Sequence, residues 1–566
     1  MTKPLLLTLV AFGAIACAGS AGPEADSHDA LAVADSSDAV VETFVSELVP
    51  IFRASKEEQG IADYLERKWR DAKTQVWHDA PGVELERDAM HNVLIRLPAT
   101  GRFRGGEYAP VAIQAHLDMV LAVKSGVLPA GATTDEIKAY FRQNPIQVVR
   151  DADGTLHSKD QTTTLGADNG IGVAMALRYL TDDTLEHPPL ELVFTVQEET
   201  SMDGAIKFGP EIRAKVFINL DSPDPDKVTI TSQGGSAENV SGDFAAVPAA
   251  SMVGVKLALE GLRGGHSGHD IAKPRLGAIN AFALLLRRVS ELAPGTLLVS
   301  ASSGGRGKYG SIQTSFTAGL ALPASTNVAT VAAALEATLR TEVLPAYADE
   351  ASPTLTFASD ASVDPSASGA LAGPVAEAMT TLLHRRDGKP LDGVLERDDA
   401  YPNGVKLSSN WGALSLANGP AGQKQLLLGF FTRGYEPALV RTTRDGIASE
   451  LGAVWSQSGA TPSSQVISEF SGWRTTPDHW LVKLALEASA GRFAGVRVSS
   501  GGIEPGPFSG KLPGTVFVSF GADVRDQHTT TERVTVDSIK KTSATLQRLL
   551  TELADSPDYR AFTARR

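Results

Sequence analysis

Four apolar segments of β-strand type each end in side chains that can bind a metal ion, and this pattern constrains the fold more than any other feature. They are PVAIQAH, ending at His116, LELVFTVQEE, ending at Glu199, KVFINLD, ending at Asp221, and TVFVSF, which precedes His528. A further acid, Asp168, lies in TLGADNG at the start of a helical pattern. Ligands in open α/β sheets bind beyond the carboxyl ends of the strands. We therefore expect these five side chains along one sheet edge.

Length and charge limit the class of protein. The chain has 566 residues, which is too many for one hydrophobic core, so at least two domains are expected. Its formal charge of -14 argues against a nucleic-acid partner, because binding phosphates requires a basic face. The sequence predicts a multi-domain globular protein.

The first 17 residues are typical of a signal peptide. The apolar stretch that ends at Ala16 is too short to span a bilayer but suits the core of an export signal. Cys17, the single cysteine, follows Ala-Ile-Ala and resembles the lipidated cysteine of bacterial lipoproteins. We expect residues 18–38 to be a disordered tether and the protein to be exported, anchored on the periplasmic or cell-surface side of a membrane only through this lipid. Secretion with ordinary cleavage is the alternative.

The rest of the chain predicts an α/β catalytic domain that is interrupted by a second domain. Residues 39–235 alternate strand and helix patterns, with a clear helix over 169–180, and residues 468–566 return to this character. Residues 236–467 predict an inserted α+β lid domain, and residues 124–159 a polar insertion. The fold class expected is a three-layer α/β domain that is interrupted by this insert. No tandem repeat of fixed period is present.

Taken singly, the strand-end residues have simpler explanations. His116 and Asp118 lie on the same side of a strand, so Asp118 is placed to bind the ring nitrogen that faces away from a metal. A hydrogen-bonded histidine without a metal is the alternative. The other three residues also have alternatives to metal binding. Asp168 can be a helix N-cap, Asp221 can be a turn residue, and His528 can be a residue of a polar loop.

Glu198 and Glu199 are more informative. Adjacent carboxylates repel each other, so burying both at a strand end is costly unless a cation is present. One of them can bind a metal while the other accepts a proton. The alternative is a solvated pair in a loop.

Together the candidates indicate a metal site. Two imidazoles and three carboxylates suit zinc, manganese or cobalt. Five ligands exceed what one tetrahedral catalytic zinc needs, but they suit two ions about 3.5–4 Å apart that share a carboxylate.

Six motifs resemble the M20 metallopeptidase family, and within it the aminoacyl-histidine (Xaa-His) dipeptidase branch. They are HLDMV, TTTLGADNGIGVAMAL, EETSMDGA, NLDSPD, GLRGGHSGHDI and HTTTERV, spread over about residues 92–280 and 500–550. The resemblance implies hydrolysis of short peptides, chiefly dipeptides, by a metal-bound hydroxide. The expected cofactors are two divalent ions, Zn²⁺ first and Mn²⁺ or Co²⁺ as alternatives.

The resemblance also implies roles for individual residues. Asp168 bridges both metals, His116 and Asp221 complete one site, and Glu199 and His528 complete the other. In the same family, Asp118 orients the first histidine, Glu198 is the general base, and the peptide bond between Asp168 and Asn169 is often cis.

Three residues of the insert are implied in substrate binding. His266, in GGHSG, stabilises the oxyanion, in many relatives from a partner subunit. Arg433 binds the substrate carboxylate with help from Asn410, although a cation on a strand face is the alternative for the arginine. The long insert leaves both a monomer and a homodimer open.

One departure from the family pattern concerns the closing motif, which usually reads His-Ser-Pro-Asp-Glu and here reads His528-Thr-Thr-Thr-Glu532. The metal site keeps its His and Glu, but the pocket wall can differ. Two other functions stay open. One is an aminoacylase or carboxypeptidase that acts on N-acyl amino acids or longer peptides, and the other is a non-catalytic peptide- or metal-binding lipoprotein.

Overall fold

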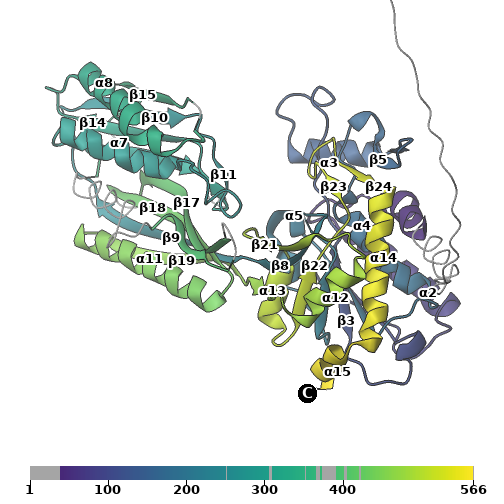
Figure 1. The fold of residues 1–566 in the computed structure, drawn as a ribbon. Coiled ribbons are helices and arrows are strands. Elements are labelled where there is room, and N and C mark those ends of the chain that lie inside the picture. Colours follow the sequence, from purple (N-terminus) through teal and green to yellow (C-terminus); the bar gives the residue numbers. More distant parts are fainter. Residues whose placement is uncertain are drawn as a thin grey trace, which may run out of the picture.

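The computed structural model describes residues 38–564 except 223, 250, 305–308, 351, 365–369, 372–390, 401–403 and 420–421. The predicted signal peptide, Cys17 and nearly all of the tether lie outside these residues. No helix in the described part of the chain is both long and apolar enough to cross a membrane. The chain forms two lobes, each built on a nine-stranded sheet (Figure 1).

The first sheet has the strand order β1-β2-β6-β3-β7-β22-β8-β20, and β21 also pairs with β8. Its strands are β1 Glu84–Arg87, β2 Val93–Leu97, β3 Val111–His116, β6 Leu190–Thr195, β7 Val216–Asn219, β8 Lys227–Ser232, β20 Trp473–Arg474, β21 Gly495–Ser499 and β22 Val516–Ser519. The four central strands β6, β3, β7 and β22 are parallel. Their carboxyl ends therefore meet at one edge of the sheet.

Helices cover both faces of this sheet. One apolar cluster joins one face to α2, α4, α12 and α14, and another joins the opposite face to α6 and α13. These helices are α2 Gln59–Gln75, α4 Ala167–Thr181, α6 Asp203–Ile206, α12 Trp480–Ala488, α13 Pro505–Lys511 and α14 Val536–Glu552. All six residues of β3 are buried, as expected for a parallel strand that is covered on both faces. The predicted three-layer α/β fold is confirmed.

The second sheet has the order β15-β10-β14-β12-β17-β18-β9-β19, with β16 beside β17. Its strands are β9 Gly234–Ala245, β10 Val253–Glu260, β12 Leu297–Gly304, β14 Phe316–Leu322, β15 Thr354–Ser359, β16 Gly393–Asp398, β17 Gly404–Asn418, β18 Gln423–Gly434 and β19 Thr461–Phe470. Helices α7 (Ala278–Leu292), α8 (Val328–Thr338) and α11 (Pro437–Gln457) pack on it through a separate core. We propose that this lobe is the inserted domain predicted for residues 236–467.

The second sheet contains a repeat that we did not detect in the sequence. Numbered along the chain, β10, β12, β14 and β15 form one half, and β9, β17, β18 and β19 form the other. From the outer edge to the centre, the first half reads β15, β10, β14, β12 and the second reads β19, β9, β18, β17. In each half this is the fourth, first, third and second strand of that half along the chain, and β12 and β17 pair antiparallel at the centre. Because β9 precedes the whole first half, the repeat is not tandem and produces no fixed sequence period.

The two connections between the lobes pass each other backbone to backbone. A Cβ atom on Gly234 would lie 2.2 Å from the amide nitrogen of Gly472, and one on Gly472 would lie 2.5 Å from the amide nitrogen of Gly234. Only glycine permits this approach. The crossing is therefore closely packed on both chain segments.

The predicted polar insertion at 124–159 has a structure of its own. It contains α3 (Thr134–Gln143) and the strands β4 (Val148–Arg150) and β5 (Thr155–Ser158). β5 pairs with β24 (Arg533–Thr535), which in turn pairs with β23 (Val524–Arg525). His528 lies in the loop between β23 and β24, so this small sheet holds its backbone.

Candidate active site

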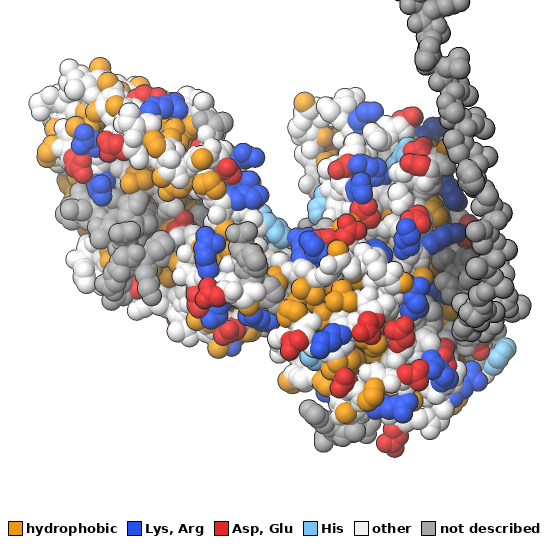
Figure 2. Space-filling view, in the orientation of Figure 1, with side chains coloured by type: hydrophobic (Ala, Val, Ile, Leu, Met, Phe, Trp, Pro, Cys, Tyr) orange, Lys and Arg blue, Asp and Glu red, His pale blue; other side chains and the backbone are white. Residues whose placement is uncertain are grey.

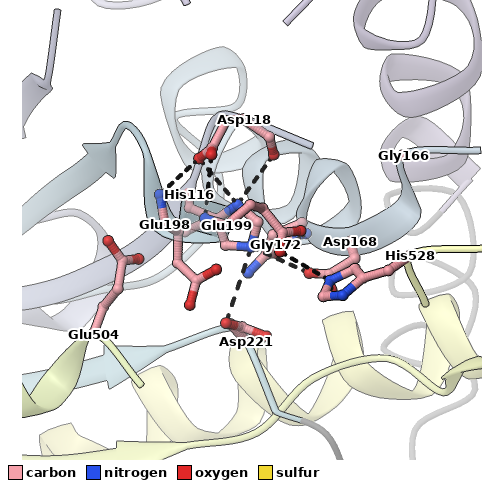
Figure 3. Close-up of polar contacts among 12 residues, drawn as sticks. His116, Asp118, Gly166, Asp168, Gly172, Glu198, Glu199, Asp221, Glu504 and His528 are labelled. Carbon is pink, nitrogen blue, oxygen red and sulfur yellow. Dashed lines mark hydrogen bonds and ion pairs between the residues drawn. The ribbon is translucent and has the colours of Figure 1, made fainter. Parts of the chain in front are cut away.

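The structure brings the five predicted metal ligands together at the carboxyl edge of the first sheet (Figure 3). His116 is the last residue of β3, and Asp221 follows β7 by two residues. Asp168 lies in the first turn of α4, and Glu199 lies in α5 (Glu198–Ser201), which follows β6. His528 reaches the group from the β23–β24 loop.

Asp168 lies between the two histidines. Its Oδ1 is 3.1 Å from Nε2 of His116, and its Oδ2 is 3.4 Å from Nε2 of His528. The same nitrogen of His528 lies 2.9 Å from Oε2 of Glu199, and Nε2 of His116 lies 4.0 Å from Oδ2 of Asp221. The donors thus form two groups that share Asp168.

The charges of this cluster call for a cation. Burial, together with the nearby Asp168 carboxylate, raises the pKa of Asp221 to about 7, and hydrogen bonds to Asp168 and Glu199 raise the pKa of His528 to about 10. Glu199 Oε1 is buried and has no hydrogen-bond partner among the residues that the structure describes. Donor atoms of His116, Asp168 and Glu199 lie within 4.8 Å of one another. Nitrogen and oxygen donors in this arrangement fit a divalent metal.

Asp118 is completely buried and holds the two glutamates in place. Its carboxylate accepts the backbone N–H of Glu198 at 3.0 Å and of Glu199 at 3.2 Å, and the hydroxyl of Ser55 at 2.6 Å. Nδ1 of His116 lies 3.1 Å from the carbonyl oxygen of Asp118 and 3.6 Å from its Oδ1. We had expected the side chain of Asp118 to orient the histidine. The hydrogen bond instead goes to the backbone carbonyl oxygen of Asp118.

The Asp168 turn is held by a carboxylate from the far end of the chain. Glu532 accepts the backbone N–H groups of Leu165, Gly166 and Asp168 at 2.8–3.0 Å. The peptide bond between Asp168 and Asn169 is cis, as the family resemblance implied. Glu532 was noted in the closing motif, but the turn that it holds could not be read from the sequence.

Arg53 is a buried cation behind the cluster that sequence analysis missed. It is 1% exposed and donates to the carbonyl oxygens of Leu117, Asp118 and Gly166. Burial lowers its pKa, although the nearby carboxylates, Glu532 foremost, act in the opposite direction. The sequence around Arg53 shows only helical periodicity, so it did not indicate that the arginine contacts the ligand cluster.

Glu504 is a second residue that sequence analysis missed. It is fully buried, and its Oε2 accepts the side-chain N–H of Gln114 and, at 2.9 Å, the hydroxyl of Thr195. Gln114 in turn accepts from Asn219, which accepts from Ser519 at 2.6 Å. Thr195, Gln114, Asn219 and Ser519 form a row of hydrogen bonds across β6, β3, β7 and β22, next to the strand ends that carry the metal ligands. Burial raises the pKa of Glu504 to about 8.

Glu198 points into the space between Glu504 and the ligand cluster (Figure 3). Burial raises its pKa well above the ordinary value, and the carboxylates of Glu199, Asp221 and Glu504 add to this elevation. The structure records no hydrogen bond to its carboxylate among the described residues. A carboxylate with an elevated pKa and free oxygens is suited to accept and release a proton.

The ligand cluster opens into a cleft of about 480 Å³ between the lobes. Both Glu198 and Glu199 line it, as do His266 and Arg433 of the second lobe. Acidic and histidine side chains are visible where the lobes meet (Figure 2). Nδ1 of His266 accepts the backbone N–H groups of Gly268 and His269 at 3.0 and 3.1 Å. The neutral ring must therefore carry its proton on Nε2.

Arg433 is a buried cation that borders this cleft. Its Nε donates to the hydroxyl of Ser267 at 3.0 Å, its guanidinium lies 4.3 Å from the ring centre of Phe431, and its Nη1 has no partner among the described residues. Burial alone lowers its pKa to about 9, so an anion would stabilise it. These contacts place the guanidinium on a strand and beside the cleft, so they fit both the predicted carboxylate role and the alternative of a strand-face cation.

Asn410 does not reach the cleft. Its amide donates to the backbone oxygens of Tyr309 and Ser311 at 2.9 and 3.0 Å, and the residue is 3% exposed. The predicted contact with substrate is therefore replaced by support of the segment that carries Tyr309, which lines the cleft. The sequence could not separate these roles, because both place a polar side chain on β17.

The parallel sheet, the nitrogen and oxygen donors at its carboxyl edge and the adjoining cleft fit a metal-dependent hydrolase. The chain belongs to peptidase family M20/M25/M40, whose profile matches residues 163–552. It is a peptide-bond hydrolase, as predicted.

Individual relatives extend this likeness over most of the chain. The chain is 29% identical to the cytosol non-specific dipeptidase of Escherichia coli over 483 residues, which are 84% of this chain and 92% of the relative. The crystal structure of aminoacylhistidine dipeptidase from Vibrio alginolyticus matches with a TM-score of 0.69 and 25% identity, covering 92% of this chain and 97% of that one. Aminopeptidase PepT from Bacillus cereus shares the fold, with a TM-score of 0.52, 18% identity and coverage of 92% and 99%.

Proposed function

We propose that this protein is a dipeptidase that uses two divalent metal ions and Glu198 as its general base. The observation that carries the proposal is the cleft of about 480 Å³, in which Glu198, Glu199, His266 and Arg433 of one chain face the same space. This volume lies within the range of small-molecule sites. The names of the Escherichia coli and Vibrio alginolyticus relatives, both dipeptidases, support the substrate class.

The residues of the chain divide the work of hydrolysis. Glu198 takes one proton from the attacking water while the water oxygen bonds to the scissile carbonyl carbon. His266 donates its Nε2–H to the carbonyl oxygen as negative charge develops there. As the C–N bond breaks, Glu198 returns the proton to the leaving amine. Arg433 holds the carboxylate of the departing residue.

The metal ions would be held by His116 and Asp221 on one side, by Glu199 and His528 on the other, and by Asp168 between them. When bound, such ions polarise the scissile carbonyl and lower the pKa of water. Asp118 holds the backbone of both glutamates. This contact keeps the base and the neighbouring ligand in a fixed relation.

A substrate panel on metal-depleted and metal-restored protein tests this function. We expect dipeptides such as Ala-His and Ala-Phe to be hydrolysed after addition of Zn²⁺, Mn²⁺ or Co²⁺, and chelation to remove this activity. N-acetylated amino acids and longer peptides form the comparison arms. Preferential cleavage of either would favour the aminoacylase or carboxypeptidase alternative, and binding of dipeptides without hydrolysis would favour a non-catalytic role.

Export stays a prediction that rests on residues 1–17. The name of the Escherichia coli relative places that protein in the cytosol, which weighs against export of this chain. Fractionation of cells that express the full chain or Cys17→Ser, with labelling by a radioactive fatty acid, decides the question. Sizing of the same preparation separates a monomer from a homodimer.

A further inference from the structure

The side of the cleft beyond the metal ligands is apolar and is built by both lobes. Phe431, on β18, and Phe470, at the end of β19, line it from the second lobe, and their ring centres lie 6.2 Å apart. Met202, directly after α5, lines it from the first lobe, and Gly502 borders it from the loop after β21. These four residues, the apolar wall of the cleft, have no role in the proposed chemistry.

Gly502 lies where Phe470 of the second lobe and Met202 of the first lobe come together. A Cβ atom added there would lie 2.9 Å from the ring of Phe470 and 3.3 Å from the terminal methyl group of Met202. The backbone of Gly502 lies outside the positive-φ region that favours glycine, so alanine fits the chain conformation. A methyl group at this position would therefore change the space along the wall without straining the loop.

The position of Arg433 decides which part of a substrate meets this wall. Its guanidinium lies 4.3 Å from the ring centre of Phe431, and its Nη1, which has no partner in the described part of the chain, is available to a carboxylate. A dipeptide whose carboxylate is bound by Arg433 presents its scissile bond toward Glu198. The side chain on the same residue as that carboxylate then lies against Phe431 and Phe470.

We propose that the apolar wall selects dipeptides whose carboxyl-terminal residue is aromatic or large and aliphatic. This inference rests on the proposed dipeptidase function and narrows its substrate class. Apolar area removed from water by the wall stabilises the bound substrate in proportion to the size of the side chain. An acidic side chain is disfavoured because Glu198, Glu199 and Asp203 line the same cleft.

The test compares kcat/KM for Ala-Phe, Ala-Leu, Ala-His, Ala-Gly and Ala-Asp on metal-restored protein. We expect Ala-Phe and Ala-Leu to exceed Ala-Gly by about tenfold or more, since even one methylene in an apolar pocket changes specificity by about 10- to 200-fold. The kcat/KM for Ala-His should lie between those of the two apolar dipeptides and that of Ala-Gly, and Ala-Asp should have the lowest value.

Two variants change the wall in opposite directions. Gly502→Ala adds a methyl group beside Phe470, and Phe470→Ala removes a ring. We expect Gly502→Ala to lower kcat/KM for Ala-Phe about tenfold while Ala-Gly changes less than about threefold, and Phe470→Ala to reduce the preference for Ala-Phe over Ala-Gly by a similar factor. Val466→Ala is the matched control, because this β19 residue is 45% exposed and does not line the cleft.

The outcomes separate this inference from the proposed function. Hydrolysis of all the dipeptides at equal rates, or equal losses on Ala-Phe and Ala-Gly in both variants, would overturn the specificity and leave the dipeptidase intact. No hydrolysis of any dipeptide would overturn both. If Phe470→Ala fails to fold, Phe470→Leu is measured instead, with the same expected change in the preference ratio.

Discussion

The two sides of the cleft are built in different ways. On the first lobe, Asp118 and Glu532 accept backbone N–H groups of the segments that carry Asp168, Glu198 and Glu199, so the backbone of these segments is fixed by several hydrogen bonds. On the second lobe, Arg433 makes one side-chain hydrogen bond to Ser267 and stacks on Phe431. The first side is rigidly connected, whereas the second is apolar and sparsely hydrogen-bonded.

This difference assigns separate tasks to the two sides. Rigid positioning of charges is what chemistry at a metal centre requires. Apolar surfaces with a single buried cation are suited to recognise a side chain and a carboxylate. Changes on the first side should therefore remove turnover or metal, and changes on the second side should alter which substrate is bound and how tightly.

The largest effect is expected for Glu199→Gln. The change removes the charge that faces His528, so we expect loss of bound metal and of turnover by at least about 10³-fold, since ligand and orienting groups act as a unit. Elemental analysis of the dialysed protein measures the metal. Asp203→Asn, another acid of the cleft, is the matched control and should keep its metal; a fully metallated Glu199→Gln protein would contradict the ligand assignment.

A smaller effect is expected for Arg433→Met. Loss of a buried charge partner for the substrate carboxylate should raise KM for Ala-Phe by about 100-fold, with a lesser change in kcat, because such pairs contribute about 2–5 kcal/mol. The amide Ala-Phe-NH₂ provides the matched comparison. Wild-type protein should prefer the free acid strongly and the variant should not; an equal preference in both proteins would show that Arg433 does not bind the carboxylate.

Metal binding should release protons. The pKa of His528 is raised from 6.5 to about 10 by hydrogen bonds to Asp168 and Glu199, so the metal-free protein carries this proton at pH 7 and a metal must displace it. Metal affinity should therefore rise with pH between about 6.5 and 10. Calorimetry in buffers of different ionisation enthalpy measures the released protons, and buffer-independent heats would contradict the expectation.

The smallest effect concerns stability. Because the pKa of Glu504 is raised from 4.5 to about 8, its contribution to folding is present below pH 4.5 and is lost as the pH rises toward 8. The glutamine in Glu504→Gln cannot ionise. In metal-free protein, the free energy of unfolding of this variant relative to wild type should therefore be higher at pH 8 than at pH 5. The upper limit of this difference is about 1.4 kcal/mol for each unit by which the pKa is raised. Urea unfolding at both pH values measures this gain.

The matched control for that comparison is Glu211→Gln, whose wild-type side chain is 76% exposed. It should show the same difference from wild type at both pH values. Equal gains at pH 5 and pH 8 in Glu504→Gln would mean that the buried carboxyl is not held in its protonated form.

Much of the catalytic side was predictable because its ligands follow long apolar strands. His116, Asp168, Asp221 and the two glutamates lie within 120 residues of sequence, and a parallel sheet places strand ends side by side. Arg53, Glu504 and the turn held by Glu532 were not predictable. Each acts through contacts with backbone or polar groups more than 60 residues away, and no local periodicity encodes such contacts.

The second lobe was predicted less completely. Its strands and helices were visible as apolar patterns, but the fourth-first-third-second repeat was hidden because one half is inserted into the other. The same limit applies to Asn410, whose backbone partners Tyr309 and Ser311 lie about 100 residues earlier in the chain. The apolar wall combines residues from both lobes and could be recognised only in three dimensions.

The central claim is that adjacent glutamates have different tasks, with Glu198 as the base and Glu199 as the ligand. The most direct test is to measure metal content and kcat for Glu198→Gln on one preparation. The account predicts metal content equal to wild type and a kcat that is lower by about 10²–10⁴-fold. A variant that keeps its turnover, or that loses its metal, would contradict it.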